Sequence, residues 1–325
     1  MSSIRVVVCV AFWILPILGM QPAVGQEYPN RPIRLLAGST PGGGTDITAR
    51  LVASKLSERI GQMVIVDNRP GIGNVVARNI AEQATPDGYT LVIVSGSSVI
   101  GARFVYNNPI DTRKNFSSVS LLSSYPFPLM IHPSMSATTV KELIAYAKSR
   151  PPDTLNYGST GVGSMAHLAS ALLGSMAGVS MQHVPYKAVN LGMLDLMRGQ
   201  IQLLFGSATA AMPHAKSGKI KILAFSSAKR SRTYPEIPTV AESGLPGFDV
   251  TGWFSIMGPY GMPRAAIIKL NREIGEVLKL PEIVKMFATD GADATHSTPA
   301  ELDVLIDQEE KRWSKLIKAT GLVFN

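Results

Sequence analysis

The chain alternates short apolar runs of strand character with stretches of helical character. Each run spans four to seven residues and is rich in Ile, Leu and Val. This alternation is typical of βαβ units, and it predicts an α/β fold built on mostly parallel sheets flanked by helices. The predicted strands are residues 33–38, 63–68, 90–95, 129–132, 155–159, 181–186, 201–206, 220–226 and 253–257.

Helices are predicted from apolar spacing and from their end signals. Apolar positions within 47–60 recur at helical spacing and form one face. A second helix is expected to begin after Thr139, because Thr139 and Glu142 have the spacing of a capping box, and Pro151 ends it. Three further helical stretches follow the last predicted strand, at 263–279, 281–289 and 299–320.

Two predicted strands end in turns of glycine and hydroxyl residues that lead into a helix. The first reads AGSTPGGGTDI at residues 37–47, and the second reads YGSTGVGSMAH at residues 157–167. In open α/β sheets, ligands lie at the carboxyl ends of strands, against helix N-termini. Glycine allows close backbone approach there, and free N–H groups attract anions. One loop in each half of the chain predicts a ligand cleft between two domains.

The chemistry of these loops narrows the class of ligand. Neither loop contains lysine or arginine, the phosphate-binding P-loop pattern is absent, and GIGNVV at 71–76 lacks the third glycine of a dinucleotide fingerprint. A single carboxylate held by N–H groups, hydroxyls and helix dipoles fits better. The predicted ligand-binding residues are Ser39, Thr40, Gly42, Gly43, Thr45 and Asp46 in the first loop, Ser159, Thr160, Gly163, Ser164 and His167 in the second, and Ser207 after the run 201–206.

Some of these residues have two interpretations. Asp46 lies in a first helical turn, where the dipole stabilises a carboxylate, so it either supports the helix start or faces an ammonium or hydroxyl of the ligand. His167 either lines the cleft or packs beside it. Trp253 and Phe254 either close one side of the pocket or belong to the core. The remaining histidines are too dispersed for a metal motif, and we expect neither a metal nor a cofactor.

Composition supports a two-domain protein without a nucleic-acid partner. The 325 residues are 46% hydrophobic, enough for two cores. The net charge of +8 is scattered along the chain. Nucleic-acid binding is not expected, because no basic stripe with interleaved aromatic residues is present.

The N-terminal segment predicts export. Residues 1–25 have the pattern of a cleaved secretory signal, with Arg5 before an apolar segment at 6–18 and small residues up to Gly25. A retained membrane anchor is the alternative, although this segment is shorter than the about 20 residues of a spanning helix. The one cysteine, Cys9, lies inside the signal, so the mature chain has no thiol. We therefore expect a periplasmic protein.

Taken together and in order, several longer stretches resemble the Bug, or TctC-like, family of extracytoplasmic solute receptors, the binding proteins of tripartite tricarboxylate transporters. The resemblance covers nearly the whole mature chain. The stretches are YPNRPIRLLAGSTPGGGTDITARLVASKLSERIGQMVIVDNRPG, TPDGYTLVIVSGSS, TVKELIAYAKSRP, LNYGSTGVGSMAHLASALLGSMAGVSMQHVPYK, PHAKSGKIKILAFSSAKRS, IPTVAESGLPGFDVTGWFSIMGPYGMP and LNREIGEVL.

The resemblance implies a Venus-flytrap architecture of two α/β domains with mixed, mostly parallel sheets. Domain 1 would comprise residues 26–128 and 252–325, and domain 2 residues 129–251. A small organic acid would be held by its carboxylate between the loops 39–46 and 159–164, partly through water, and delivered to membrane transporter subunits. We expect a monomeric receptor that is not an enzyme.

The chain departs from the family pattern near the expected cleft. Small polar residues replace the phenylalanine region of the first loop, Val75 stands where asparagine is common, and Gly206 stands where many members have aspartate. If that aspartate pairs with a ligand ammonium, its absence argues against amino-acid cargo. The identity of the acid stays open.

Two other functions remain alternatives to transport. A ligand sensor would have the same receptor domain, so the sequence does not separate it from a transport receptor. A secreted serine hydrolase has less support, because the Gly-x-Ser-x-Gly elbow is absent.

Overall fold

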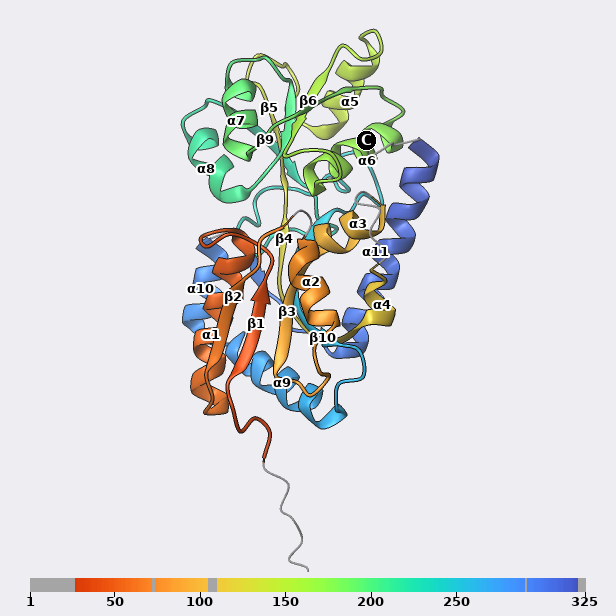
Figure 1. Cartoon of the computed structure of the whole chain (residues 1–325). Helices are drawn as coiled ribbons and strands as arrows, with labels where there is room; N and C mark the ends of the chain where they lie inside the picture. Colours follow the sequence, from red (N-terminus) through yellow and green to blue (C-terminus); the bar gives the residue numbers. More distant parts are fainter. Residues whose placement is uncertain (1–26, 72–73, 105–109, 290, 321–325) are drawn as a thin grey trace, which may run out of the picture.

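The computed structural model describes residues 27–71, 74–104, 110–289 and 291–320. It confirms an α/β fold with two mixed sheets flanked by helices, arranged as two lobes (Figure 1). Lobe 1 surrounds a six-stranded sheet and lobe 2 a five-stranded sheet. The predicted signal segment, residues 1–25, lies outside the described residues.

The sheet of lobe 1 joins early and late parts of the chain. Its strand order is β11-β4-β10-β3-β1-β2. The strand β1 is parallel to β2 and β3, whereas β10 is antiparallel to β3 and β4, and β4 is antiparallel to β11. The strands are β1 (Ile33–Ala37), β2 (Val64–Asn68), β3 (Thr90–Ser95), β4 (Phe116–Pro126), β10 (Thr251–Pro259) and β11 (Asp293–Ala294).

The sheet of lobe 2 has the order β7-β6-β8-β5-β9. The strand β6 is parallel to β7 and β8, whereas β5 is antiparallel to β8 and β9. These strands are β5 (Pro128–Ile131), β6 (Asn156–Ser159), β7 (Gln182–Pro185), β8 (Leu203–Phe205) and β9 (Lys221–Phe225).

Each of the nine predicted strands overlaps an observed one, but β4 and β11 were not predicted. The expectation of mostly parallel sheets is too strong, because five of the nine strand pairs are antiparallel. The antiparallel pairs all involve β4, β5 or β10, the strands next to the crossings between lobes. Neighbouring strands become parallel when a right-handed helical crossover connects them. A strand that enters its sheet from the other lobe has no such connection, so it can pair in the antiparallel direction.

The chain crosses twice between the two sheets. Phe127 alone separates β4 from β5, and residues 226–250 separate β9 from β10. Ser226 links both crossings, because its Oγ accepts a hydrogen bond from the Phe127 N–H at 2.8 Å and donates one to the Val250 carbonyl. The two crossing segments therefore lie side by side where the chain passes between the lobes.

Local signals account for several helix ends. The Thr139 Oγ1 accepts the Glu142 N–H at 3.2 Å, so the predicted cap is present, while the Glu142 carboxylate accepts the Thr138 N–H. The helices beside the first sheet are α1 (Gly44–Ile60), α2 (Val75–Glu82), α3 (Gly96–Phe104), α4 (Thr112–Asn115), α9 (Arg264–Val277), α10 (Pro281–Thr289) and α11 (Pro299–Thr320); those of lobe 2 are α5 (Val140–Lys148), α6 (Met165–Ala177), α7 (Val189–Met197) and α8 (Ala208–Lys216).

The last helix, α11, packs on both lobes. Leu302 and Ile306 belong to an apolar cluster of lobe 1, whereas Trp313 and Leu316 are buried in a cluster formed mainly by lobe 2. Figure 1 shows α11 running beside lobe 1 and ending near α6. Within the described ranges, no helix is long and apolar enough to cross a membrane.

Candidate ligand-binding site

A cavity of about 460 Å³ lies between the lobes. Thr45 contributes to it from lobe 1, and Thr160, Gly163 and Ser164 contribute from lobe 2. The two glycine-rich loops therefore meet at one cavity, as the sequence predicted for a cleft between domains.

Helix N-termini surround this cavity. Six helices place residues of their first turn or their N-cap in its lining. The unpaired N–H groups of a helix start carry about half a positive charge, so these helix starts favour an anion although the described lining residues include no cation. The residues are Thr45 of α1, the N-cap Asn74 of α2, Ser97 and Ser98 of α3, Met165 and Ala166 of α6, Val189 of α7, and the N-cap Ser207 of α8.

The start of α6 leaves N–H groups available for an anion. Ser164 is the N-cap, and its Oγ accepts the His167 N–H at 3.3 Å. The Gly163 N–H donates to His167 Nδ1 at 3.1 Å, in a backbone conformation with φ of 76° that favours glycine. Within the described part of the chain, the N–H groups of Met165 and Ala166 make no hydrogen bond to protein. Both residues line the cavity.

His167 accepts a hydrogen bond from the second loop on the side away from the cavity. Its side chain is 3% exposed, is absent from the cavity lining and stacks on His183 with ring centroids 4.2 Å apart. His183 Nε2 in turn lies 2.7 Å from Ser159 Oγ. Burial, with a smaller contribution from His183, lowers the pKa of His167 to about 4, so the ring is neutral at pH 7. Neutral Nδ1 is the acceptor that the Gly163 N–H requires.

We expect the protein to lose stability on mild acidification because of this histidine. Its pKa is about 4 in the folded protein and near 6.5 unfolded, so between those values only the unfolded chain takes up the proton. From pH 7.5 to pH 5 this linkage should lower the free energy of unfolding by about 2 kcal/mol. Urea titrations of the wild type and of His167→Asn, whose amide oxygen replaces Nδ1 as acceptor, test this. An equally steep decline in the variant would contradict the assignment.

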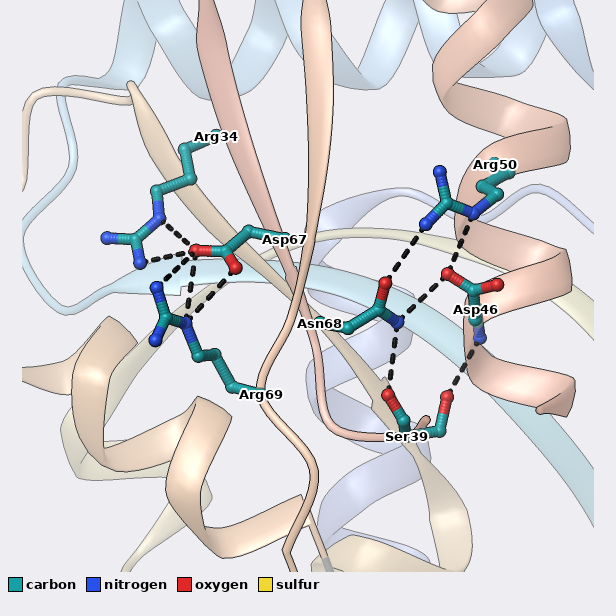
Figure 2. A network of polar contacts seen from close by, with 7 residues as sticks. All are labelled: Arg34, Ser39, Asp46, Arg50, Asp67, Asn68 and Arg69. Carbon is teal, nitrogen blue, oxygen red and sulfur yellow. Dashed lines mark hydrogen bonds and ion pairs between the residues drawn. The ribbon is translucent and has the colours of Figure 1, made fainter. Parts of the chain in front are cut away.

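Asp46 closes the first loop and does not line the cavity. Its Oδ2 accepts the Gly42 N–H at 2.9 Å, and its Oδ1 accepts Arg50 Nε and Asn68 Nδ2, both at 2.9 Å (Figure 2). Burial opposes ionisation of this carboxyl, but the hydrogen bonds from Arg50, Gly42 and Asn68 outweigh it and lower the pKa. Of the two interpretations, the contacts support the structural one.

The predicted ligand-binding residues thus fall into two groups. Those in the cavity lining are Thr45, Thr160, Gly163, Ser164 and Ser207. Those outside the lining are Ser39, Thr40, Gly42, Gly43, Asp46, Ser159 and His167. The expectation of ligand contact stays a prediction for both groups.

Sequence reasoning missed several lining residues. Ser95 ends β3, and Ser97 and Ser98 lie in the first turn of α3, which begins directly after the strand at Gly96. As in the two loops already identified, serine and glycine residues stand where a strand leads into a helix. That pattern is visible in the sequence as VSGSS. Asn74 lies at the start of α2, next to residues 72–73, which are outside the described residues.

An aromatic wall completes the cavity. Tyr125 from the end of β4, Phe127 from the crossing to β5, and Phe205 line it. The rings of Tyr125 and Phe127 meet edge to face, 5.4 Å apart. Trp253, by contrast, is 2% exposed in the core of lobe 1, and neither Trp253 nor Phe254 lines the cavity.

The lining contains no Asp, Glu, Lys, Arg or His among the described residues. Tyr125 is its one titratable side chain, and burial raises the pKa of this phenol to about 12. In the described part of the chain, no group of three or more His, Cys, Asp or Glu side chains is placed to hold a metal ion. The site therefore offers neutral hydrogen-bonding groups, helix dipoles and aromatic surface.

Known proteins are similar to this chain in sequence and architecture. The family model described as tripartite tricarboxylate transporter family receptor, TctC, matches residues 48–322. Protein BugT of Bordetella pertussis is 32% identical over 99% of each chain. A solved structure described as R. palustris Rpa4515 with adipate is 32% identical, covers 91% of this chain and 99% of its own, and has a TM-score of 0.76.

MatC of Rhodopseudomonas palustris, solved with bound malate, is 26% identical, with a TM-score of 0.72 over 89% of this chain and all of its own. Members of this family are periplasmic solute-binding receptors and not enzymes. With a family match over most of its length, the chain belongs to the TctC family of tripartite tricarboxylate transporter receptors.

Proposed function

We propose that the protein captures a small organic acid in the cavity between its lobes by binding the carboxylate. The observation that carries this proposal is that six helices begin at a cavity without a charged side chain in its described lining. Helix N-termini stabilise anions through free N–H groups and the aligned peptide dipoles. Because these donors are neutral, they suit a carboxylate with its single charge best among the anions considered.

The start of α6 is the proposed carboxylate position in lobe 2. The N–H groups of Met165 and Ala166 and the hydroxyls of Thr160 and Ser164 border the same side of the cavity. Charge-assisted hydrogen bonds from such donors are short and about twice as strong as neutral ones. Thr45 and the serines in the first turn of α3 line the same cavity from lobe 1, and we infer that they complete the shell.

The remaining wall suits the carbon skeleton of the acid. Tyr125, Phe127 and Phe205 present aromatic surface, and Val189 adds an aliphatic side chain. Ligand sites commonly combine such apolar walls with a few polar groups that set orientation. A cavity of about 460 Å³ accommodates a small acid together with water. The relatives solved with adipate and with malate hold acids of this size class.

Transport is the proposed purpose of this binding. We infer that residues 1–25 direct export and are removed, and that domain 1 (26–128 and 252–325) and domain 2 (129–251) close on the ligand as a monomer. The closed receptor then delivers the acid to membrane subunits of a tripartite transporter. The family match supports this role. N-terminal sequencing of the secreted protein checks for cleavage after Gly25.

A thermal-shift panel tests the ligand class. The secreted protein, unfolded and refolded to remove carried-over ligand, is heated with mono-, di- and tricarboxylates, aromatic acids and acidic amino acids. A ligand present at a hundred times its Kd stabilises the protein by about 2.7 kcal/mol, which corresponds to a rise in melting temperature of about 4 °C for a chain of this length. We expect shifts from one group of acids. A flat panel from folded protein would overturn the proposal.

A further inference from the structure

We propose that Asn68, a residue outside the cavity, is a positioning residue that sets the first loop in its binding-competent geometry. The inference rests on the proposed function, because it concerns affinity for the carboxylate ligand. It starts from the position of Asn68 at the end of β2, where β2 pairs with β1 and where Ala37, the last residue of β1, lies opposite Asn68.

The Asn68 amide holds both ends of the loop. Its Nδ2 donates to the Ser39 carbonyl at 3.0 Å and to Asp46 Oδ1 at 2.9 Å, while its Oδ1 accepts Arg50 Nη2 at 2.9 Å (Figure 2). Ser39 begins the loop and Asp46 ends it. One planar group therefore fixes the distance between the two points where the loop leaves the sheet and enters α1.

We call the hydrogen bonds of Asn68 to Ser39, Asp46 and Arg50 the Asn68 clamp. The loop is also closed by hydrogen bonds between its own residues. The Asp46 N–H donates to Ser39 Oγ at 3.1 Å, and Asp46 Oδ2 accepts the Gly42 N–H. The Gly43 N–H donates to the Thr40 carbonyl at 3.0 Å. These bonds make the loop a unit whose placement depends on its attachment to β2. Asn68 is the side chain of β2 that makes this attachment.

The clamped residues are direct neighbours of cavity residues. Gly38 precedes Ser39, Thr45 precedes Asp46, and both Gly38 and Thr45 line the cavity. A shift of Ser39 or Asp46 therefore moves a wall of the cavity and the first turn of α1. In this way Asn68 acts on ligand affinity without touching the ligand.

The chemistry of the clamp suggests a variant with a specific signature. In Asn68→Asp an oxygen replaces Nδ2 and faces two acceptors, the Ser39 carbonyl and the Asp46 carboxylate, so the ionised variant repels the loop. Protonation restores one O–H donor at this position. The buried Asp46 charge raises the pKa of the new carboxyl, because like charges disfavour joint ionisation. Arg50, whose Nη2 lies 2.9 Å from Asn68 Oδ1, opposes this rise, but its side chain is half exposed to solvent and already pairs with Asp46. Affinity of the variant should thus recover on acidification.

The experiment compares Kd values from pH 8 to pH 5 for the wild type, Asn68→Asp and Asp67→Asn, using an acid from the panel that remains ionised over this range. Asp67 is the matched control, because its ion pairs with Arg34 and Arg69 lie on the other face of the same strand and do not reach the loop (Figure 2). At pH 8 we expect Asn68→Asp to bind about tenfold or more weakly than the wild type. The ratio of the Asn68→Asp Kd to the wild-type Kd should decrease toward pH 5. The Kd of Asp67→Asn should equal that of the wild type at every pH.

The outcomes separate this inference from the proposed function. Wild-type protein that binds no acid would overturn the proposed function. Wild-type binding with an equal Kd for Asn68→Asp at every pH would overturn the role of Asn68, as would a weakened affinity that stays constant with pH. If Asn68→Asp does not fold at pH 8, Asn68→Ser, which removes the amide without adding a charge, should still bind more weakly but without recovery at pH 5.

Discussion

Replacing Gly206 by aspartate should reduce affinity for the carboxylate ligand by about 100-fold. Gly206 lines the cavity between Phe205, which ends β8, and Ser207, the N-cap of α8. A ligand carboxylate at the proposed position, taken as about 5 Å from the added charge, is repelled by about 3 kcal/mol at an effective dielectric constant of about 20, which is close to two powers of ten in Kd. No lysine or arginine of the described lining would offset this charge.

The matched control is Gly206→Asn, which has nearly the same shape and no charge. An added Cβ at this position would lie 2.7 Å from Met130 Cε and 3.3 Å from Val189 Cγ2, the ends of two side chains that can shift. Both variants carry that steric cost, so calorimetric Kd values for the pair isolate the charge. Equal affinities would contradict a carboxylate bound within this cavity close to Gly206.

Removing the Arg78 side chain should destabilise lobe 1 by about 3–5 kcal/mol. The guanidinium is fully buried and donates to the Ser98 carbonyl at 2.9 Å and to Thr112 Oγ1 at 2.7 Å. Burial lowers the pKa of Arg78 to about 10, so the group stays charged at pH 7. Arg78→Ala leaves a cavity and two buried acceptors without donors, which the free energy of unfolding in urea measures.

Arg78→Met separates volume from hydrogen bonding. Methionine refills much of the space, so this variant should lose less than Arg78→Ala, about 1–3 kcal/mol for the unsatisfied acceptors. Because Ser98 lines the cavity, both variants should also weaken ligand binding. A loss below about 1 kcal/mol in Arg78→Ala would contradict a supporting role for the buried arginine.

One of the two strands that the sequence did not predict, β4, shows why local patterns are insufficient here. The strand β4 has the sequence FSSVSLLSSYP, in which serines resemble a loop. Ser120 is nevertheless fully buried, and its Oγ donates to the Ser297 carbonyl, 177 residues away. Ser297 Oγ in turn accepts the Leu121 N–H at 3.1 Å. Polar residues become strand residues here because a distant segment satisfies their hydrogen bonds.

The candidate site was predictable in outline but not in detail. The two loops were located because glycine and hydroxyl residues between a strand and a helix have a local physical meaning. Their ligand-facing and supporting residues were not separable, since Ser39 and Thr45 belong to the same residue classes. Only the fold shows that Ser39 Oγ accepts the Asp46 N–H whereas Thr45 lines the cavity.

The sequence by itself determined the α/β class, the nine strands it marked, the Thr139 cap and the two loops, because each depends on residues a few positions apart. The tertiary structure alone decided the antiparallel strands at the crossings, the aromatic wall of Tyr125 and Phe127, the burial of Arg78 and the clamp of Asn68. Asn68 lies 29 residues from Ser39, and Arg78 lies 34 residues from Thr112. Such pairings form only when strands align and lobes pack, because the paired residues are distant in sequence and meet only in the folded chain.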